Sequence, residues 1–128
     1  MFEFQTVILL YIVFIWFVVI HTFEEISQDI FEINLGPITI TKKKYLFGAS
    51  MITTLNLATL GLLVAGYQLG LYLGIFTSSV IGILQAVVHT IGYFKEGRNA
   101  QQLGAGFYTS IPLALAGGLL LYHILAAL

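Results

Sequence analysis

The sequence predicts an all-α, polytopic membrane protein whose four transmembrane helices form an antiparallel bundle. Apolar residues make up 59% of the 128 positions and charged residues only 9%, and the mean hydropathy is +0.97. A soluble domain of this size could not cover that much hydrocarbon with a polar shell. Four apolar segments, each close to the length of about 20 residues that crosses a bilayer, supply the spans. They lie at about 4–21, 45–65, 69–93 and 103–125.

The first of these segments shows no sign of being a cleaved signal peptide. Residues 2–20 have no basic residue before them and no small-residue cleavage site after them, which favours a retained helix over a signal peptide. The four segments use most of the chain, so we expect one transmembrane domain covering residues 1–128.

Glycines organise the second and third segments. Gly66-Tyr67-Gln68 alone separates the two segments, which makes them antiparallel neighbours joined by a tight turn. Gly66, Gly70 and Gly74 stand four residues apart, a spacing that lets helix backbones approach closely. The same glycine faces make a homo-oligomer plausible.

The one long polar segment, residues 22–44, lies between the first and second spans. Its first half predicts an amphipathic helix, either along the interface or continuing the first span. Asn34-Leu35-Gly36-Pro37 predicts a turn, and residues 38–41 predict a short extended piece. Lys42-Lys43-Lys44 is typical of an anchor at the membrane surface.

Positive charge predicts the orientation in the cell membrane. With four spans, all basic residues fall on one side, in the first and third loops; they are Lys42, Lys43, Lys44, Lys95 and Arg98. By the positive-inside rule that side is cytoplasmic and both termini are outside. The net charge of -1 argues against a nucleic-acid partner, so membrane lipids are the expected surroundings.

His21-Thr22-Phe23-Glu24-Glu25 ends the first apolar segment. On a continuous helix, His21, Glu24 and Glu25 stand at i, i+3 and i+4, on one face within about one turn. That spacing is found in metal sites and acid/base pairs, and also in ordinary polar helix ends. The predicted topology puts this motif at the cytoplasmic side.

The third segment carries a stripe of small or polar residues at spacings of three and four: Gly74, Ser78, Gly82, Gln85, His89, Gly92 and Glu96. Such a stripe faces protein or water instead of lipid. His89 is predicted at the same depth as His21, so a bundle could bring both imidazoles together. His123 falls at the opposite side and is interpreted as a terminal interface residue.

Two further segments contribute polar groups. Asn56 is expected near the middle of the bilayer, where an amide needs a hydrogen-bond partner. Tyr108, Thr109 and Ser110 lie just inside the cytoplasmic end of the fourth segment, and Pro112 is expected to kink that helix.

These residues predict a metal site near the cytoplasmic face. The predicted ligands of the metal are His21, Glu24, Glu25 and His89. Because the chain has no cysteine, only imidazole and oxygen ligands are available, which suit zinc, iron or manganese. The predicted catalytic groups are Glu24, Glu25 and Glu96, and the residues expected to contact cofactor or substrate are Asn56, Gln85 and Tyr108.

The leading functional hypothesis is a metal-dependent enzyme acting on a lipid or another apolar, membrane-dissolved small molecule. Metal-assisted hydrolysis and oxidation at a di-metal centre both fit the predicted ligands. Without a metal, the histidines could shuttle protons beside a glutamate. The alternatives are a small transporter or ion-conducting subunit that uses the same cluster, and a structural partner of a larger complex.

The His21-Thr22-Phe23-Glu24-Glu25 motif, at the end of the first of four membrane helices and with His89 on a later one, resembles the HXXEE-domain family of putative integral membrane proteins. The resemblance covers the layout of nearly the whole chain, and the motif is its one sharp match. It implies that His21, Glu24 and Glu25 form the signature site of the family. It implies no defined activity.

Overall fold

The computed structural model describes residues 2–28, 33–35, 37–96 and 106–128 and confirms the all-α bundle. Four helical spans are long and apolar enough to cross a membrane. They are α1 (Phe2–Ser27), α2 (Lys42–Val64), the composite span α3 (Gln68–Thr77), η1 (Ser78–Leu84) and α4 (Gln85–Glu96), and α5 (Phe107–Ala127). In lipid, helices satisfy their own backbone hydrogen bonds, which is why the apolar segments fold this way.

The predicted spans differ from the helices mainly at the polar ends. The polar stretch after His21 continues α1 as far as Ser27, so of the two predicted options the continuous helix is found. The three lysines begin α2, and the Thr41 side chain caps this helix by accepting a hydrogen bond from the Lys44 backbone N–H at 3.4 Å. Residues 103–105 of the predicted fourth span lie outside the described residues.

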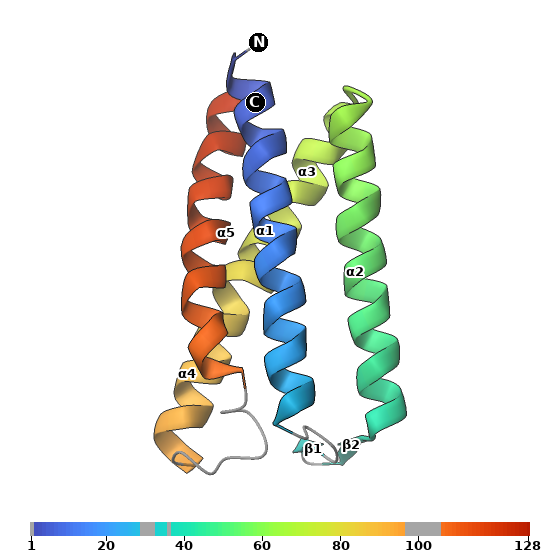
Figure 1. The fold of residues 1–128 in the computed structure, drawn as a ribbon, viewed down its shortest axis with the longest axis vertical. Helices are drawn as coiled ribbons and strands as arrows, with labels where there is room; N and C mark the ends of the chain where they lie inside the picture. Colours follow the sequence, from blue (N-terminus) through green and yellow to red (C-terminus); the bar gives the residue numbers. More distant parts are fainter. Residues whose placement is uncertain (1, 29–32, 36, 97–105) are drawn as a thin grey trace.

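A two-stranded hairpin connects the first two spans. Strand β1 (Ile33–Leu35) pairs antiparallel with β2 (Ile38–Ile40), so that Ile33 lies opposite Ile40. The extended piece predicted at residues 38–41 is therefore confirmed. The predicted turn was too long, because Asn34 and Leu35 belong to β1. Figure 1 shows this hairpin at one end of the bundle and both termini at the other.

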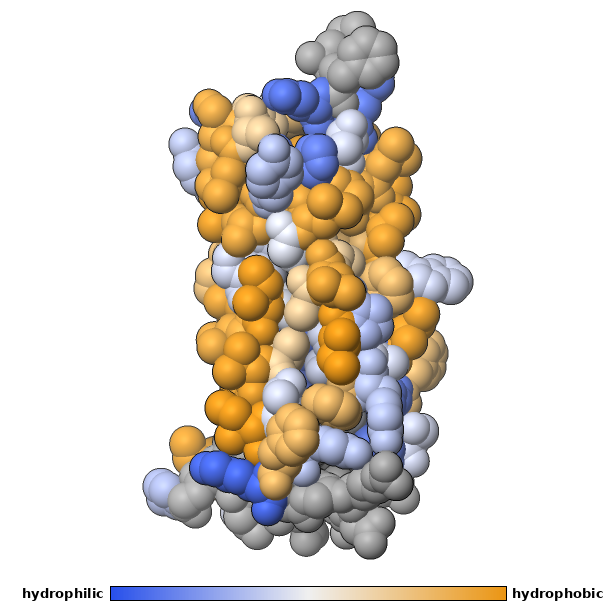
Figure 2. All heavy atoms as spheres, turned by 90° about the vertical axis from the view of Figure 1, so that its left-hand side faces the viewer, coloured by the Kyte–Doolittle hydropathy of each residue, from blue (hydrophilic) through white to orange (hydrophobic). Residues whose placement is uncertain are grey.

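The outer surface is apolar along the length of the bundle, as a lipid-facing surface should be. Figure 2 shows hydrophobic residues over most of the surface between the two ends and hydrophilic residues gathered at the ends. Trp16 and Leu9 of α1 are 66% and 65% exposed. The core of the bundle therefore occupies only a narrow stripe of each helix.

The buried stripe of α1 leads to the predicted site. Val7, Tyr11, Phe14 and Val18 are buried at alternating spacings of four and three residues. Continuing the same spacing reaches His21 and then Glu25. The residues that hold the bundle together and the residues of the site thus share one helix face.

Glycines set the distance between helices. A Cβ on Gly117 of α5 would lie 2.9 Å from the Ser78 carbonyl oxygen and 3.0 Å from the Gly82 Cα atom. A Cβ on Gly70 would lie 2.8 Å from the backbone nitrogen of Leu63. These contacts explain why α5 packs closely on η1, and α3 on α2, as the glycine spacing predicts for the second and third spans.

Asn56 takes part in a buried polar network in the middle of the bundle. Tyr11 Oη donates to Asn56 Oδ1 at 2.9 Å and lies 2.8 Å from Thr77 Oγ1. All three side chains are fully buried. The network links α1, α2 and α3, so Asn56 satisfies its amide by joining helices and does not contact the predicted site.

Candidate metal site

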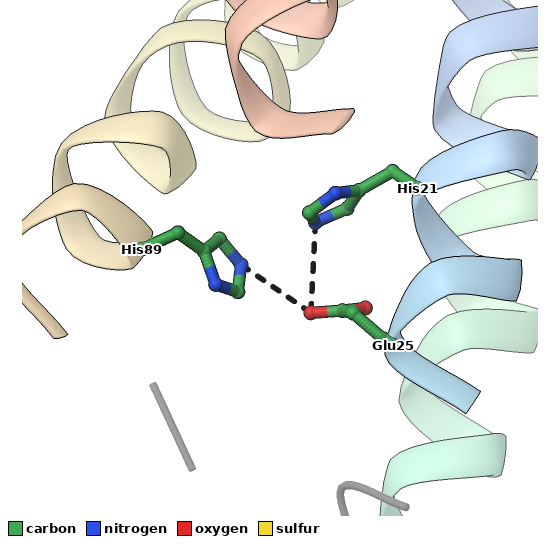
Figure 3. A group of neighbouring side chains, drawn as sticks. All are labelled: His21, Glu25 and His89. Carbon is green, nitrogen blue, oxygen red and sulfur yellow. Dashed lines mark ion pairs between the residues drawn. The ribbon is translucent and has the colours of Figure 1, made fainter. Parts of the chain in front are cut away.

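His21, Glu25 and His89 converge near the hairpin end of the bundle (Figure 3). His21 and Glu25 stand one turn apart on α1, and His89 extends from α4. The shared oxygen Glu25 Oε1 lies 3.5 Å from His21 Nε2 and 3.3 Å from His89 Nε2. One ligand atom from each of the three residues falls within 4.8 Å of the others. The sequence prediction that the two imidazoles meet is therefore confirmed.

These separations fit the ligands of one metal ion. Two ligands about 2.1 Å from a tetrahedral ion lie about 3.4 Å apart, close to both His–Glu separations in this cluster. Two imidazoles and one carboxylate suit zinc, and the same set with open positions suits iron. Three protein ligands leave room for a water or substrate, which is the pattern of catalytic sites. With protonated imidazoles, the same contacts are two ion pairs.

Hydrogen bonds determine which nitrogen of His21 can bind a metal. The Glu24 carboxylate accepts hydrogen bonds from the backbone N–H of Thr109, at 2.8 Å, and from the Thr109 hydroxyl. The hydroxyl proton is thereby used, so the hydroxyl oxygen accepts from His21 Nδ1 at 2.9 Å. This arrangement places the proton of neutral His21 on Nδ1 and leaves the Nε2 lone pair directed to the cluster.

Tyr45 orients the carboxylate of the cluster. Its hydroxyl donates to Glu25 Oε2 at 2.7 Å, while Oε1 of the same carboxylate faces the two histidines. Tyr45 lies in the first turn of α2, which begins after the cap at Thr41. Besides α1 and α4, helix α2 therefore also holds the site, since carboxylate ligands of metals are themselves oriented by such hydrogen bonds.

The beginning of α5 is built onto the end of α1. Gly106 has a φ of +82°, and a Cβ there would lie 2.7 Å from His21 Cε1 and 3.0 Å from Glu25 Cγ. Its backbone N–H donates to Gln28 Oε1 at 3.0 Å. Gln28 and Glu24 thus satisfy N–H groups that an isolated helix would leave without partners. The negative carboxylate of Glu24 also suits the positive end of the α5 dipole.

A cavity of about 380 Å³ adjoins the cluster between α1, α2 and the η1–α4 part of the third span. The three cluster residues lie in its wall with Lys44 and Tyr45. Apart from Thr22 and Gln85, the rest of the wall is apolar. Its side chains include residues from three spans: Val18, Ala49, Ile52, Val80 and Ile81. An apolar cavity with a few convergent polar groups is the usual form of a small-molecule site.

The remaining predicted site residues have different positions. Glu24 does not join the metal-ligand group but binds Thr109, as described above. Gln85 lines the cavity one turn from His89. Tyr108 is 60% exposed, makes ring contacts with Tyr93 and Phe107 and is not among the residues that line the cavity. The side chain of Glu96 lies outside the described residues.

Sequence reasoning did not assign roles to Thr109, Tyr45 and Gly106. Tyr108, Thr109 and Ser110 follow one another, and each step rotates the side chain by about 100°. Only the packing of α5 on α1 decides that Thr109 faces His21. Gly106 offered a signal, because a glycine just before an apolar helical run can adopt a positive φ that other residues avoid.

No protein-family model, curated protein or solved structure matches the chain. The case for function therefore depends on the geometry of the cluster and the cavity.

Proposed function

We propose that this protein is a metal-dependent membrane enzyme that acts on a lipid or another membrane-dissolved substrate. One observation carries the proposal: the three possible ligands lie in the wall of an otherwise largely apolar cavity. A purely structural metal site would be closed by a fourth ligand, whereas a catalytic one adjoins space for a substrate. The donor set supports zinc, iron or manganese as the metal.

Each residue then has a definite task. His21 Nε2, His89 Nε2 and Glu25 Oε1 would hold the metal, which in such sites polarises a substrate oxygen or activates a water. Tyr45 fixes the Glu25 carboxylate. Glu24 is engaged by Thr109, so we assign it the positioning of His21 in place of the predicted catalytic role.

The cavity supports an apolar substrate. Its side toward the middle of the membrane is formed by Val18, Ile52 and Val80, and its polar groups lie toward the hairpin end. A substrate could therefore keep its hydrocarbon part at membrane depth while its reactive group meets the cluster. We place this end of the bundle on the cytoplasmic side because Lys42, Lys43 and Lys44 begin α2 there.

A transporter would need a polar path across the whole bilayer, and the described core supports this function less well. From the cluster toward the termini, the buried stripe of α1 continues as Val18, Phe14, Tyr11 and Val7. Only Tyr11 of these carries a polar group. The buried polar side chains that α2 and α3 contribute there, Asn56, Thr59 and Thr77, are hydrogen-bonded to Tyr11 or to helix carbonyl oxygens. Proton or cation flux in sealed vesicles that is lost in Glu25→Gln would reverse this ranking.

Metal analysis tests the proposal. The protein should be purified through a tag without histidine and should retain about one equivalent of a transition metal. His21→Ala and His89→Ala should each remove most of it. His123→Ala is the matched control, since His123 is the third histidine of the chain and makes an edge-to-face contact with Tyr122 at the opposite end of the bundle. A content under about 0.1 equivalent that His21→Ala leaves unchanged would exclude the metal.

A further inference from the structure

Gln85, a residue of the cavity wall, has one buried polar atom without a partner. Among the described residues, Gln85 Oε1 is the buried side-chain oxygen or nitrogen that makes no hydrogen bond. A buried carbonyl oxygen without a partner is disfavoured, because the hydrogen bond that it made to water in the unfolded chain is not replaced. Such groups are rare in folded proteins and call for a physical explanation. A ligand that donates a hydrogen bond to Gln85 supplies one.

The neighbouring backbone fixes the orientation of the Gln85 amide. Gln85 Nε2 donates to the carbonyl oxygen of Gly82 at 3.2 Å. Exchanging the amide nitrogen and oxygen would place two acceptors face to face, which the hydrogen-bond network excludes. The atom without a partner is therefore an acceptor, and it selects a ligand that carries an O–H or N–H group.

The π-helical segment η1 ends directly before Gln85. Short π-helical turns are rare and occur frequently at functional sites. This segment contributes Val80 and Ile81 to the cavity wall, and Gln85 and His89 follow at the same wall. One continuous surface thus presents first an apolar stretch, then a hydrogen-bond acceptor and then a possible metal ligand.

The opposite wall leaves room for an extended chain. Gly48 of α2 lines the cavity, and a Cβ added there would meet nothing within 4 Å. The residues of α2 that line the cavity between Tyr45 and Ile52 span about 10 Å at 1.5 Å per residue.

We infer that the cavity binds an amphipathic molecule with a long apolar chain and a hydrogen-bond donor, O–H or N–H, next to its reactive end. The donor binds Gln85 Oε1, and the chain lies between η1 and the Gly48 side of α2. This inference rests on the proposed function in that it names the substrate class of the same site. The binding itself requires no metal.

Photolabelling tests the inference with the full chain reconstituted in lipid nanodiscs. The probe is a long-chain primary alcohol that carries a diazirine in its chain. Competitors of equal chain length are the alcohol, the primary amide, the methyl ester and the alkane. The alcohol or the amide should compete about tenfold better than the methyl ester and the alkane, as one added hydrogen bond allows. Comparing these two donors distinguishes an O–H from an N–H ligand.

Three variants locate the binding. Gln85→Leu should reduce the preference for a donor to less than about twofold. Gly48→Leu should remove most of the labelling by filling the cavity, and Gly48→Ala should reduce it in part if the larger variant folds poorly. Gly61→Leu is the matched control, because Gly61 stands on the same helix with nothing within 4 Å of its added Cβ. It should label like the wild type.

The outcomes separate this inference from the proposed function. Equal competition by all four compounds, or full labelling of Gly48→Leu, would overturn the inference even if the metal is present. Donor-selective labelling of a protein that binds no metal would uphold the inference and remove the enzyme proposal. Metal content should stay unchanged in Gly48→Leu and Gln85→Leu, because neither residue belongs to the ligand group.

Discussion

His21 has different neighbours on its two ring nitrogens. Nδ1 contacts the Thr109 hydroxyl, and Nε2 faces Glu25. Through these contacts Glu24 orients the His21 ring by way of Thr109, whereas Glu25 itself belongs to the cluster. The sequence places both glutamates near His21 but could not divide these tasks, because the division depends on how α5 packs against α1.

The hydroxyl of Thr109 is predicted to hold His21 in its metal-binding form. Thr109→Val keeps the shape of the side chain but removes the group between Glu24 and His21. Metal affinity should fall about 10- to 100-fold, measured by competition with a chelator of known affinity. Thr109→Ser should restore it. Tyr108→Phe, in which an exposed neighbour changes, should bind metal like the wild type; equal loss in both variants would contradict the assignment.

Gly106 is predicted to be required for metal binding, because any side chain at this position would displace the His21 ring. Gly106→Ala and Gly66→Ala both put a side chain at a positive φ, +82° and +78°, and each should lower the stability by about 1–2 kcal/mol. Only the Gly106 methyl group would collide with His21, since nothing lies within 4 Å of a Cβ on Gly66. Metal affinity should therefore fall in Gly106→Ala alone. Similar metal affinities in two similarly destabilised variants would show that the contact is unimportant.

At the scale of the elements, the composite third span brings the bundle and the site together. The sequence predicts its stripe of small and polar residues, and Gly74, Ser78, Gly82 and His89 are indeed buried. The π-helical segment within it was not predictable. Its hydrogen bonds join residues five apart, a pattern that has no distinct amino-acid composition and depends on packing. At this segment, η1 approaches α5 through Gly82 and Gly117. Because Gly82 and His89 belong to the same stripe of this span, the position of His89 relative to α1 depends on this contact.

The contact between Gly82 and Gly117 is predicted to leave no room for a larger side chain, so that adding one lowers the stability of the bundle. Gly117→Ala would put a methyl group 2.9 Å from the Ser78 carbonyl oxygen and 3.0 Å from Gly82 Cα, and backbone atoms cannot move aside as flexible side chains do. Overpacking of this kind costs about 1–3 kcal/mol. The melting temperature in detergent should fall in Gly117→Ala. Gly118→Ala, whose Cβ meets nothing within 4 Å, should melt at or above the wild-type temperature.

At the scale of the whole molecule, hydropathy alone predicts the four spans, because a single apolar segment can satisfy its own backbone hydrogen bonds inside a bilayer only as a helix. The meeting of His21 and His89 follows from topology, since both fall near the same end of antiparallel spans. Which side chain of each turn faces the cluster does not follow, because hydropathy is insensitive to helix rotation. That is why Tyr108 was predicted at the site, whereas its neighbour Thr109 is the residue that contacts His21. Asn56 does face the core, but it lies in the middle of the bundle, away from the end where Tyr45 contacts Glu25.

The orientation of the bundle in the membrane is predicted from charge and can be tested directly. The chain has no cysteine, so a single introduced cysteine is the only thiol that a membrane-impermeant maleimide can label. Thr39→Cys marks the hairpin end and Gln68→Cys marks the turn at the end that holds both termini (Figure 1), and both positions are exposed. Neither substitution alters the basic residues that set orientation. In intact cells only Gln68→Cys should be labelled, and in inverted vesicles only Thr39→Cys. The reverse pattern would place the cluster on the outer side and require a substrate that approaches from outside.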